Sequence, residues 1–468
     1  MYVTQLERIS DRLWNPWLLG GFLLLGLYFS LRTGFFQLFG IRTWLRMTLG
    51  SLFRRGKKEE GQGALTQFQA MATALAATIG TGSIAGVATA IFYGGPGAVF
   101  WMWVSAFLGM MTGFVEKTLA VRYRKRDGKG WRGGPMEYME DGLGMKWLAV
   151  WFAAAVTAAA LGGGGVVQSN SIASSLSAVF GWEPLSVGLI TAAVTGIVTM
   201  GGIHRIGKVC EKLVPIMALG FIGGGGVVLI RHAQAVLPAL AQILSEAFAP
   251  KPVIGGGLGY GMMTAMRYGV ARGVFTNEAG LGSSSMAHAQ ARVKEPAEQG
   301  MWGIFEVFVA TLVVCTVSAL VILTSGVYEK AAALAAIQDG RVGETMAGAP
   351  LSAAAFETVF GAWGGVFVAV CLLLFAFSSL LGWSYYGERG LEYLMGNGKG
   401  RGCFRLLFLG AIVVGSTGDL AAVWQLSDLC NGLMALPNLI ALLLLSPEAF
   451  SLWRIWMEKN RKREKDRM

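Results

Sequence analysis

Two long apolar stretches of this 468-residue chain are each interrupted near the middle by glycines and small polar residues. Residues 77–86 read Ala-Thr-Ile-Gly-Thr-Gly-Ser-Ile-Ala-Gly, and residues 273–282 read Gly-Val-Phe-Thr-Asn-Glu-Ala-Gly-Leu-Gly. Such residues weaken a helix, and a backbone that leaves the helix at membrane depth persists only where protein or a water-filled cavity surrounds it. The two interruptions therefore require a fold that encloses both of them.

The composition places these stretches in a membrane. Hydrophobic residues make up 54% of the chain and charged residues only 14%, against about 25% charged in an average soluble domain. The 67 glycines suit close helix packing and broken helices. A net charge of +11 would favour a nucleic-acid partner in a soluble protein, but here the basic residues lie between apolar segments. We expect a polytopic membrane protein, embedded in a lipid bilayer, with no nucleic-acid partner.

Residue types that carry chemistry in enzymes and metal sites are scattered. The five cysteines form no CxxC or Cys/His cluster, so we expect neither a disulfide framework nor a transition-metal site. The three histidines are far apart, and His288 is interpreted as a buried, hydrogen-bonded structural residue. The chain also lacks a HExxH pair, a nucleophile with its base, and the repeated selectivity motif of a channel. These features argue against an enzyme or a channel and imply no cofactor.

Windows of about 19 residues predict eleven membrane crossings. Their bounds are 14–31, 65–92, 97–121, 147–179, 185–201, 213–230, 257–289, 301–325, 361–386, 403–418 and 420–446. The first crossing is not a cleaved signal peptide, because it is long enough to span and lacks a small-residue cleavage pattern after it. The fourth and seventh crossings are so long that they must tilt, break or continue into a loop.

The distribution of basic residues gives an independent test of this count. With the N-terminus outside, the predicted cytoplasmic segments carry 30 Lys and Arg residues and the predicted external segments only 6. Cytoplasmic segments attract Lys and Arg, so this bias supports eleven spans with a cytoplasmic C-terminus. We expect a multi-pass protein of the cell inner (plasma) membrane whose basic tail, residues 447–468, lies in the cytoplasm.

Without the first span, the crossings divide into five plus five. Residues 65–230 would form one repeat and 257–446 the other, and the interrupted span is the first member of each. An odd number of spans per repeat inverts the two halves relative to each other. Inverted repeats with discontinuous helices are typical of secondary transporters, which bind substrate at the repeat interface near the membrane midplane.

Three motifs in these spans resemble the sodium:alanine/glycine symporter family of bacteria and archaea. They lie at residues 80–91 with 94–98, at 276–283 with the following 287–289, and at 375–388. The resemblance covers most of the chain. It implies an all-α integral membrane protein with the leucine-transporter-like fold, built as a 5+5 inverted repeat plus an extra N-terminal helix at 14–31. The chain departs from the family at Ser83, where an Asn is usual, and this changes the hydrogen bonding of the first interruption.

An amino-acid zwitterion could bind at the two interruptions. Opened helix ends expose free N–H groups for a carboxylate and free C=O groups for an ammonium. The first interruption is predicted to bind the carboxylate and the second the ammonium, and the side chain is expected to meet Phe275, Ala279, Ile79 and Trp383. The substrate-binding candidates at the interruptions are Thr78, Gly80, Thr81, Gly82, Phe275, Thr276, Asn277 and Ala279. The alternative is that the glycines serve only helix packing.

Two polar residues in the span at 147–179 extend this prediction. Family members place a ligand-contacting glutamine in this region, and the resemblance carries that role to Gln168. Asn170 is equally well explained by a hydrogen bond between helices, which contributes about 1 kcal/mol.

The resemblance also implies one sodium ion between the first and eighth core helices. Its ligands here would be the carbonyls of Ala76, Ile79 and Phe375 and the hydroxyls of Ser378 and Ser379. Adjacent serines in an apolar helix also commonly bond to carbonyls of their own helix. A second sodium site in related transporters uses an amide at the position of Ser83, so a second ion is not expected.

Glu278 is the residue most difficult to place in a membrane. A carboxylate at that depth costs roughly 3 kcal/mol, so a paired or functional role is the default. Glu278 could brace the unwound segment by accepting backbone N–H bonds, couple a proton or face a cation, and bracing is favoured. Arg267 and Arg272 could pair with it only if the interruption folds back. Glu306 is a second buried acid with the same alternatives, whereas Asp428 and Asn431 are assigned to bonding between helices.

These observations favour sodium-coupled symport of small neutral amino acids, alanine or glycine or both, into the cell by alternating access. A proton-coupled carrier or an exchanger of the same fold is the first alternative, and a glutamine-transporting family member is the second. The expected partners are the amino acid, Na⁺ and the lipid bilayer, and a monomer would suffice.

Overall fold

The computed structural model describes residues 12–53, 64–127, 130–249, 253–254, 257–258, 261–338, 348–396, 400–418 and 420–465. The first described elements are one longer helix and three short helices: α2 (Pro16–Arg32), α3 (Phe36–Phe39), α4 (Ile41–Met47) and α5 (Leu49–Leu52). Helix α2 starts where Asn15 precedes Pro16, because the Asn15 side chain accepts hydrogen bonds from the N–H groups of Trp17 and Leu18.

The first half of the remaining chain is helical apart from one short β-ribbon. Its elements are α6 (Gln67–Thr78), η1 (Thr81–Ser83), α7 (Ala85–Gly94), α8 (Gly97–Arg122), β1 (Lys125–Asp127), β2 (Gly130–Arg132), α9 (Pro135–Glu137), η2 (Tyr138–Gly142), α10 (Lys146–Ala159), η3 (Ala160–Val167), α11 (Gln168–Phe180), α12 (Pro184–Thr199), α13 (Gly202–Arg231) and α14 (Ala233–Ala247).

The second half repeats this pattern of a short ribbon among helices. Its elements are β3 (Val253–Ile254), β4 (Gly257–Leu258), α15 (Met262–Asn277), α16 (Ser285–His288), α17 (Pro296–Val307), η4 (Phe308–Cys315), α18 (Thr316–Thr324), α19 (Lys330–Gln338), α20 (Ala349–Phe360), α21 (Ala362–Met395), α22 (Gly400–Thr417) and α23 (Leu420–Lys465).

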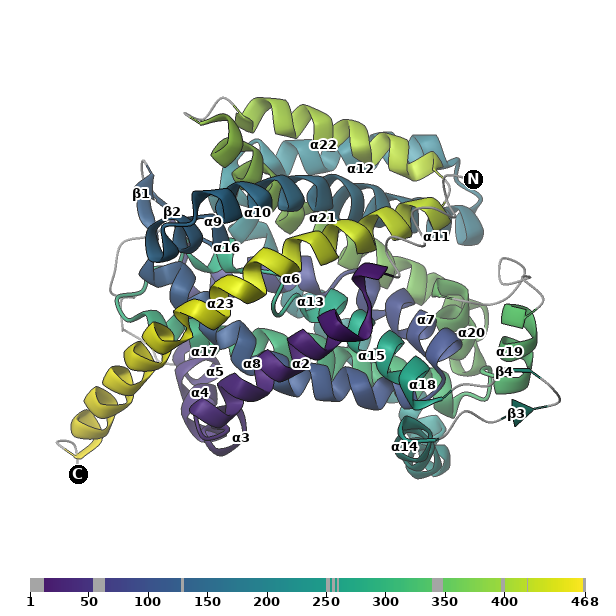
Figure 1. Ribbon diagram of the computed structural model, residues 1–468. Helices are drawn as coiled ribbons and strands as arrows, with labels where there is room; N and C mark the ends of the chain where they lie inside the picture. The colour runs from purple at the N-terminus through teal and green to yellow at the C-terminus, as the bar shows by residue number, and fades with distance from the viewer. Residues whose placement is uncertain are drawn as a thin grey trace.

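Both ribbons are antiparallel pairs in connections between helices. Strand β1 pairs with β2 in the register Lys125 to Arg132, and β3 pairs with β4. They lie at opposite ends of the molecule, and α23 runs along its length and projects beyond the end that carries β1 and β2 (Figure 1). The otherwise helical chain therefore has small β elements that the all-α prediction did not include.

Seven helical stretches within the described residues are long and apolar enough to cross a membrane. They are Gly97–Arg122, Lys146–Phe180, Gly202–Arg231, Pro296–Thr324, Ala362–Met395, Gly400–Thr417 and Ser427–Lys462. Shorter apolar helices lie at Pro16–Arg32, Ala85–Gly94 and Pro184–Thr199. Each of these segments overlaps one of the crossings predicted from hydropathy.

Both interrupted stretches are broken in the structure. Helix α6 ends at Thr78 and α7 begins at Ala85, with the single 3₁₀ turn η1 between them. Helix α15 ends at Asn277, and the chain is non-helical until α16 begins at Ser285. Helix α23 continues from Leu420 through Lys465 and so includes most of the basic tail at 447–468.

The helices pack in two main groups around the broken segments. Helix α8 contacts α2, α15 and α17, whereas α21 contacts α10, α11, α20 and α22. Helix α6 contacts α21, α13 and α17 and so lies between the groups. Its contact with α21 needs a glycine, since a Cβ on Gly382 would lie 2.6 Å from the Cβ of Ala77. Small residues at this point bring α21 against the first break.

We predict that Gly382→Val forces α6 and α21 apart. Overpacking of this kind costs about 1–3 kcal/mol, so the purified variant should show a lower apparent Tm. Gly410→Val on α22 is the matched control, because a Cβ on Gly410 meets no atom within 4 Å. Equal Tm values for the two variants would contradict the packing inferred here.

Candidate functional site

Hydrogen bonds with α11 and α18, and a close approach of α21, support the first break. The Thr81 N–H donates to Oε1 of Gln168 at 3.3 Å, and the Ser83 carbonyl accepts a 2.6 Å hydrogen bond from the Ser318 hydroxyl. A Cβ on Gly80 would lie 2.4 Å from Oγ of Ser379. Only glycine therefore permits α21 and the Gln168 side chain to approach this backbone so closely.

The second break turns through three residues with positive φ. Glu278 has φ 53°, and Gly280 and Gly282 have φ 93° and 83°. The Asn277 side chain starts the turn by accepting the Ala279 N–H at 3.0 Å. A left-handed conformation is strained for a residue with a side chain, so Glu278 requires strong external support.

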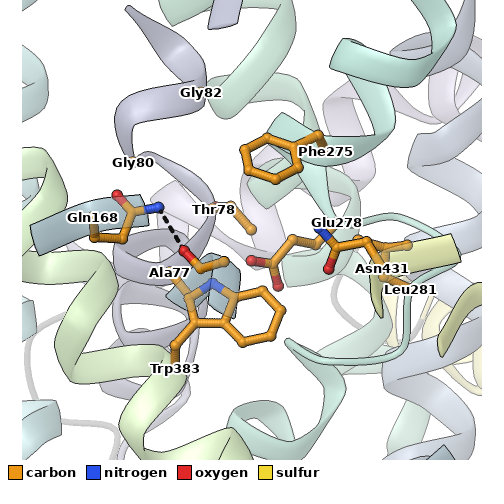
Figure 2. A pocket seen from close by; sticks show the side chains of 11 residues that line it. Ala77, Thr78, Gly80, Gly82, Gln168, Phe275, Glu278, Leu281, Trp383 and Asn431 are labelled. Atoms are coloured by element: carbon orange, nitrogen blue, oxygen red, sulfur yellow. Dashed lines mark hydrogen bonds between the residues drawn. The ribbon is translucent and has the colours of Figure 1, made fainter. Parts of the chain in front are cut away.

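An enclosed cavity lies between the two breaks (Figure 2). Residues from α6, η3, α11, α15, α21 and α23 and from both breaks line it: Ala77, Thr78, Gly80, Gly82, Gly163, Gln168, Phe275, Glu278, Leu281, Trp383 and Asn431. Its volume is about 10 Å³, roughly the room of one water molecule. An amino acid would therefore bind only when the lining side chains or helices move apart.

Most of the predicted substrate residues lie at this cavity. Thr78, Gly80, Gly82, Gln168, Phe275 and Trp383 line it. Thr81, Thr276, Asn277 and Ala279 lie outside the lining. Of these, the Thr276 hydroxyl donates to the Arg272 carbonyl at 2.7 Å, and the Ala279 methyl lies opposite Gly109 of α8.

Four lining residues were not among the predicted site residues: Ala77, Gly163, Leu281 and Asn431. Asn431 was assigned to bonding between helices, but its buried Oδ1 accepts no hydrogen bond within the part of the chain that is described. The presence of a polar residue in the apolar helix α23 indicated a buried polar contact. The sequence did not show that the Asn431 side chain faces the cavity. Asn170 does bond between helices, since its Nδ2 donates to the carbonyls of Gly415 and Gly418.

The predicted sodium ligands lie where α6 and α21 meet. The Ser378 and Ser379 hydroxyls each donate to the Ala76 carbonyl at 3.1 Å, and Ser378 also donates to the Phe375 carbonyl at 2.8 Å. Ile79 is fully buried at the end of α6. These are carbonyl and hydroxyl oxygens, the donors that hard cations prefer. Within the described residues, no cluster of His, Cys, Asp and Glu could hold a transition metal.

A buried ionic cluster supports the second break from behind. Oε1 of Glu116 accepts the N–H groups of Gly280 and Gly282, both at 3.0 Å, and the Asn438 amide at 2.7 Å. Its other oxygen lies 3.2 Å from Nζ of Lys117. The sequence alone favours Glu278 as the acceptor of these backbone hydrogen bonds. Glu116 does so instead, because α8 packs directly behind the unwound segment.

Glu306 and His288 belong to the same buried cluster. Oε2 of Glu306 lies 3.6 Å from Nζ of Lys117 and 2.9 Å from Nε2 of His288, whose Nδ1 contacts the Gln299 amide at 2.7 Å. All these side chains are fully buried. Glu306 is thus a paired acid, and His288 is a hydrogen-bonded structural residue, as expected.

Comparison with known proteins shows the family to which this chain belongs. A model of the sodium:alanine symporter family matches residues 1–468. The chain belongs to the sodium:alanine symporter family. It is 42% identical over 450 residues to the sodium/alanine symporter AgcS of Methanococcus maripaludis, covering 95% of each chain. It is 37% identical to the protein named "Probable sodium/glutamine symporter GlnT" of Bacillus subtilis, covering 94% of this chain and 88% of that one.

The fold also matches a solved transporter structure. MhsT in complex with L-phenylalanine superposes with a TM-score of 0.59 at 12% sequence identity, covering 83% of this chain and 90% of MhsT. This likeness supports the leucine-transporter-like fold. As a member of this family, the chain is a multi-pass membrane transporter and not an enzyme.

Two groups of ionic contacts join helices outside the cavity lining. In the first, Arg272 of α15 pairs with Asp428 of α23 at 2.9 Å and lies over the Phe275 ring. This assigns Asp428 to bonding between helices, as expected, and gives Arg272 a partner other than Glu278.

In the second group, the β1–β2 hairpin contacts α21 and α22. Asp127 accepts hydrogen bonds from Arg389 of α21 at 3.0 Å and from Arg401 of α22 at 2.9 Å. Burial acts to raise the pKa of Asp127, but the Arg389 hydrogen bond and the Arg389 and Arg401 charges outweigh it and hold the pKa below its usual range. The contact therefore persists as pH falls until the lowered pKa is reached.

We predict that Glu116→Leu collapses the second break. It removes the acceptor of two backbone N–H groups and leaves Lys117 with one fewer counter-charge, and breaking a buried pair costs about 3–5 kcal/mol. The measurement is the apparent Tm of the purified protein. The single variant Glu116→Gln keeps a side-chain oxygen for the two N–H groups and leaves Lys117 beside Glu306, so its Tm should fall less. A larger fall in Glu116→Gln than in Glu116→Leu would contradict the bracing role.

Proposed function

We propose that this chain couples the entry of a small neutral amino acid, alanine or glycine, to the entry of Na⁺. The observation that carries the proposal is the enclosed cavity between two helix breaks, next to a set of carbonyl and hydroxyl oxygens on α6 and α21. The name of the relative AgcS, a sodium/alanine symporter, supports the same substrate and ion.

The substrate would lie across the cavity. Its carboxylate would face the backbone of the first break near Gly80 and Gly82, with Gln168 beside it. The Phe275 and Trp383 rings would limit the side chain to hydrogen or methyl. One methylene changes binding in an apolar pocket by only about 1–3 kcal/mol, so glutamine, as in the name of GlnT, is the alternative substrate.

The sodium ion would take the hydroxyls of Ser378 and Ser379 and the carbonyls of Ala76, Ile79 and Phe375. In this role the ion is cargo and coupling partner, not a resident cofactor. It would replace the hydrogen bonds that the two hydroxyls donate to the Ala76 carbonyl and so tie α6 to α21. Closure of α6 on α21 would then depend on sodium.

We further propose eleven crossings, with 65–230 and 257–446 as inverted repeats after the extra helix at 14–31. The excess of Lys and Arg in alternate connections supports an external N-terminus, a cytoplasmic C-terminus and a plasma-membrane location. A single chain contains both breaks and the cavity, so a monomer is sufficient for transport.

Alternating access would open the two ionic contacts in turn. The Arg272–Asp428 pair would separate to admit substrate from outside. The contacts of Asp127 with Arg389 and Arg401 would separate to release it to the cytoplasm. The structure has both contacts formed, which agrees with the small enclosed cavity.

A proton-coupled carrier is the second candidate. The observation that favours it is the buried set of three carboxylates, Glu116, Glu278 and Glu306, around the single ammonium of Lys117. Transport measured at constant pH with and without sodium separates the two candidates.

We predict that proteoliposomes with an inward sodium gradient accumulate radiolabelled L-alanine, whereas replacement of sodium by potassium at constant pH abolishes uptake. Saturable uptake is expected, because the substrate binds in an enclosed site. Uptake that persists without sodium and falls in Glu278→Gln or Glu306→Gln would instead support proton coupling.

Ser378→Ala should raise the sodium concentration for half-maximal uptake by about tenfold, because one ligand worth about 1.5 kcal/mol is removed. Ser384→Ala is the matched control, since this buried hydroxyl on the same helix bonds only to the Leu381 carbonyl among the described contacts. An unchanged sodium dependence in Ser378→Ala would rule out the assigned sodium site.

Gln168→Ala should raise the KM for alanine by about tenfold with little change in maximal rate, because the amide orients the first break and lines the cavity. Gln242→Ala on α14 provides the control, as that side chain contacts Glu246 away from the cavity. Wild-type kinetics in Gln168→Ala would remove Gln168 from the substrate site.

A further inference from the structure

Glu278 differs from the other buried acids because it faces the cavity. Among the described residues its carboxylate accepts one hydrogen bond, a 2.5 Å contact from the Ser283 hydroxyl to Oε2. The side chain is 2% exposed and lines the cavity, and Figure 2 shows the carboxylate directed toward the space beside Thr78 and Trp383. Since Glu116 braces the unwound backbone, Glu278 is not needed for that role.

The nearest cations are engaged by other acids. Lys117 lies 3.2 Å from Glu116 and 3.6 Å from Glu306, and His288 contacts Glu306 at 2.9 Å. Three buried carboxylates, Glu116, Glu278 and Glu306, interact electrostatically with Lys117, and Glu278 is the one among them without an ion pair within the described residues. A buried carboxylate requires a compensating charge or a hydrogen-bond donor.

A second acceptor lies on the same cavity. Asn431 of α23 is 2% exposed, lines the cavity, and has an Oδ1 atom without a hydrogen-bond partner among the described residues. A buried polar atom in this condition indicates a missing donor. Gln168 lies across the cavity from both residues (Figure 2). The two acceptors, Glu278 and Asn431, thus lie on the opposite side of the cavity from Gln168 and the backbone of the first break.

We propose that Glu278 is a substrate-binding residue whose carboxylate receives the ammonium group of the transported amino acid, with Asn431 as a second acceptor. The inference rests on the proposed amino-acid transport and identifies what that site recognises. An ammonium supplies both the charge that Glu278 lacks and the donor that Asn431 lacks. The substrate carboxylate then lies toward Gly80, Gly82 and Gln168.

This assignment makes the α-ammonium an obligatory feature of the substrate. L-lactate has nearly the size of L-alanine but carries a neutral hydroxyl in place of the ammonium. It would leave the Glu278 charge without compensation, so the wild-type site should reject it. Carbonyl groups of the second break alone would discriminate much less, because a hydroxyl also donates to a carbonyl.

The test measures binding of L-alanine and L-lactate to the purified full-length protein in sodium by isothermal titration calorimetry. Glu278→Gln should weaken L-alanine binding about 10- to 100-fold, the range for loss of a charge-assisted hydrogen bond. It should also reduce the ratio of alanine to lactate affinity at least tenfold. Glu357→Gln, which changes an exposed acid on α20, should leave both affinities unchanged.

A sodium-induced rise in Tm shows that each variant is folded. If Glu278→Gln does not fold, Asn431→Ala provides the second test, with an expected three- to tenfold loss of alanine affinity, about the effect of one neutral hydrogen bond. Folded Glu278→Gln protein that binds alanine within twofold of wild type overturns the assignment, as does an unchanged alanine-to-lactate ratio. Wild-type protein that binds no amino acid overturns the proposed function as well.

Discussion

The second break depends on one buried carboxylate. It accepts backbone N–H groups that would bond to backbone carbonyls in a continuous helix. Glu116 accepts the N–H groups of Gly280 and Gly282, and Lys117 offsets its charge. No water is available at membrane depth to bind those N–H groups, so without such an acceptor the segment would rewind. Glu116 thereby keeps the second break unwound. Glu278 and Leu281 of this segment line the cavity.

The two breaks are supported by different chemistry, and this difference gives the cavity its polarity. Neutral groups support the first break, through Gln168 at Thr81 and Ser318 at Ser83. A charged cluster on α8 and α17 supports the second. One side of the cavity therefore presents peptide backbone and an amide, while the other presents Glu278 and the Asn431 oxygen. A zwitterion matches such a pair of walls better than an ion of a single charge.

Local sequence was sufficient to predict several of these features. Glycines at 80 and 82 and at 280 and 282 predicted the breaks, because glycine tolerates extended and left-handed backbone. The family resemblance at 375–388 implied that Ser378 and Ser379 lie near the α6 carbonyls, and both hydroxyls donate to the Ala76 carbonyl. Bracing by Glu278 was wrong, because the acceptor that reaches the loop comes from α8, more than 160 residues earlier in the chain.

The sequence by itself determined that this chain enters a membrane, breaks two helices there and belongs among amino-acid symporters, since hydropathy, glycine placement and motifs are local properties. Only the tertiary structure decided that Glu116 braces the loop, that Asn431 faces the cavity and that Arg272 pairs with Asp428. Each of these depends on which side of a helix meets a distant neighbour. In helices that are apolar nearly all round, the hydrophobic pattern does not specify that side.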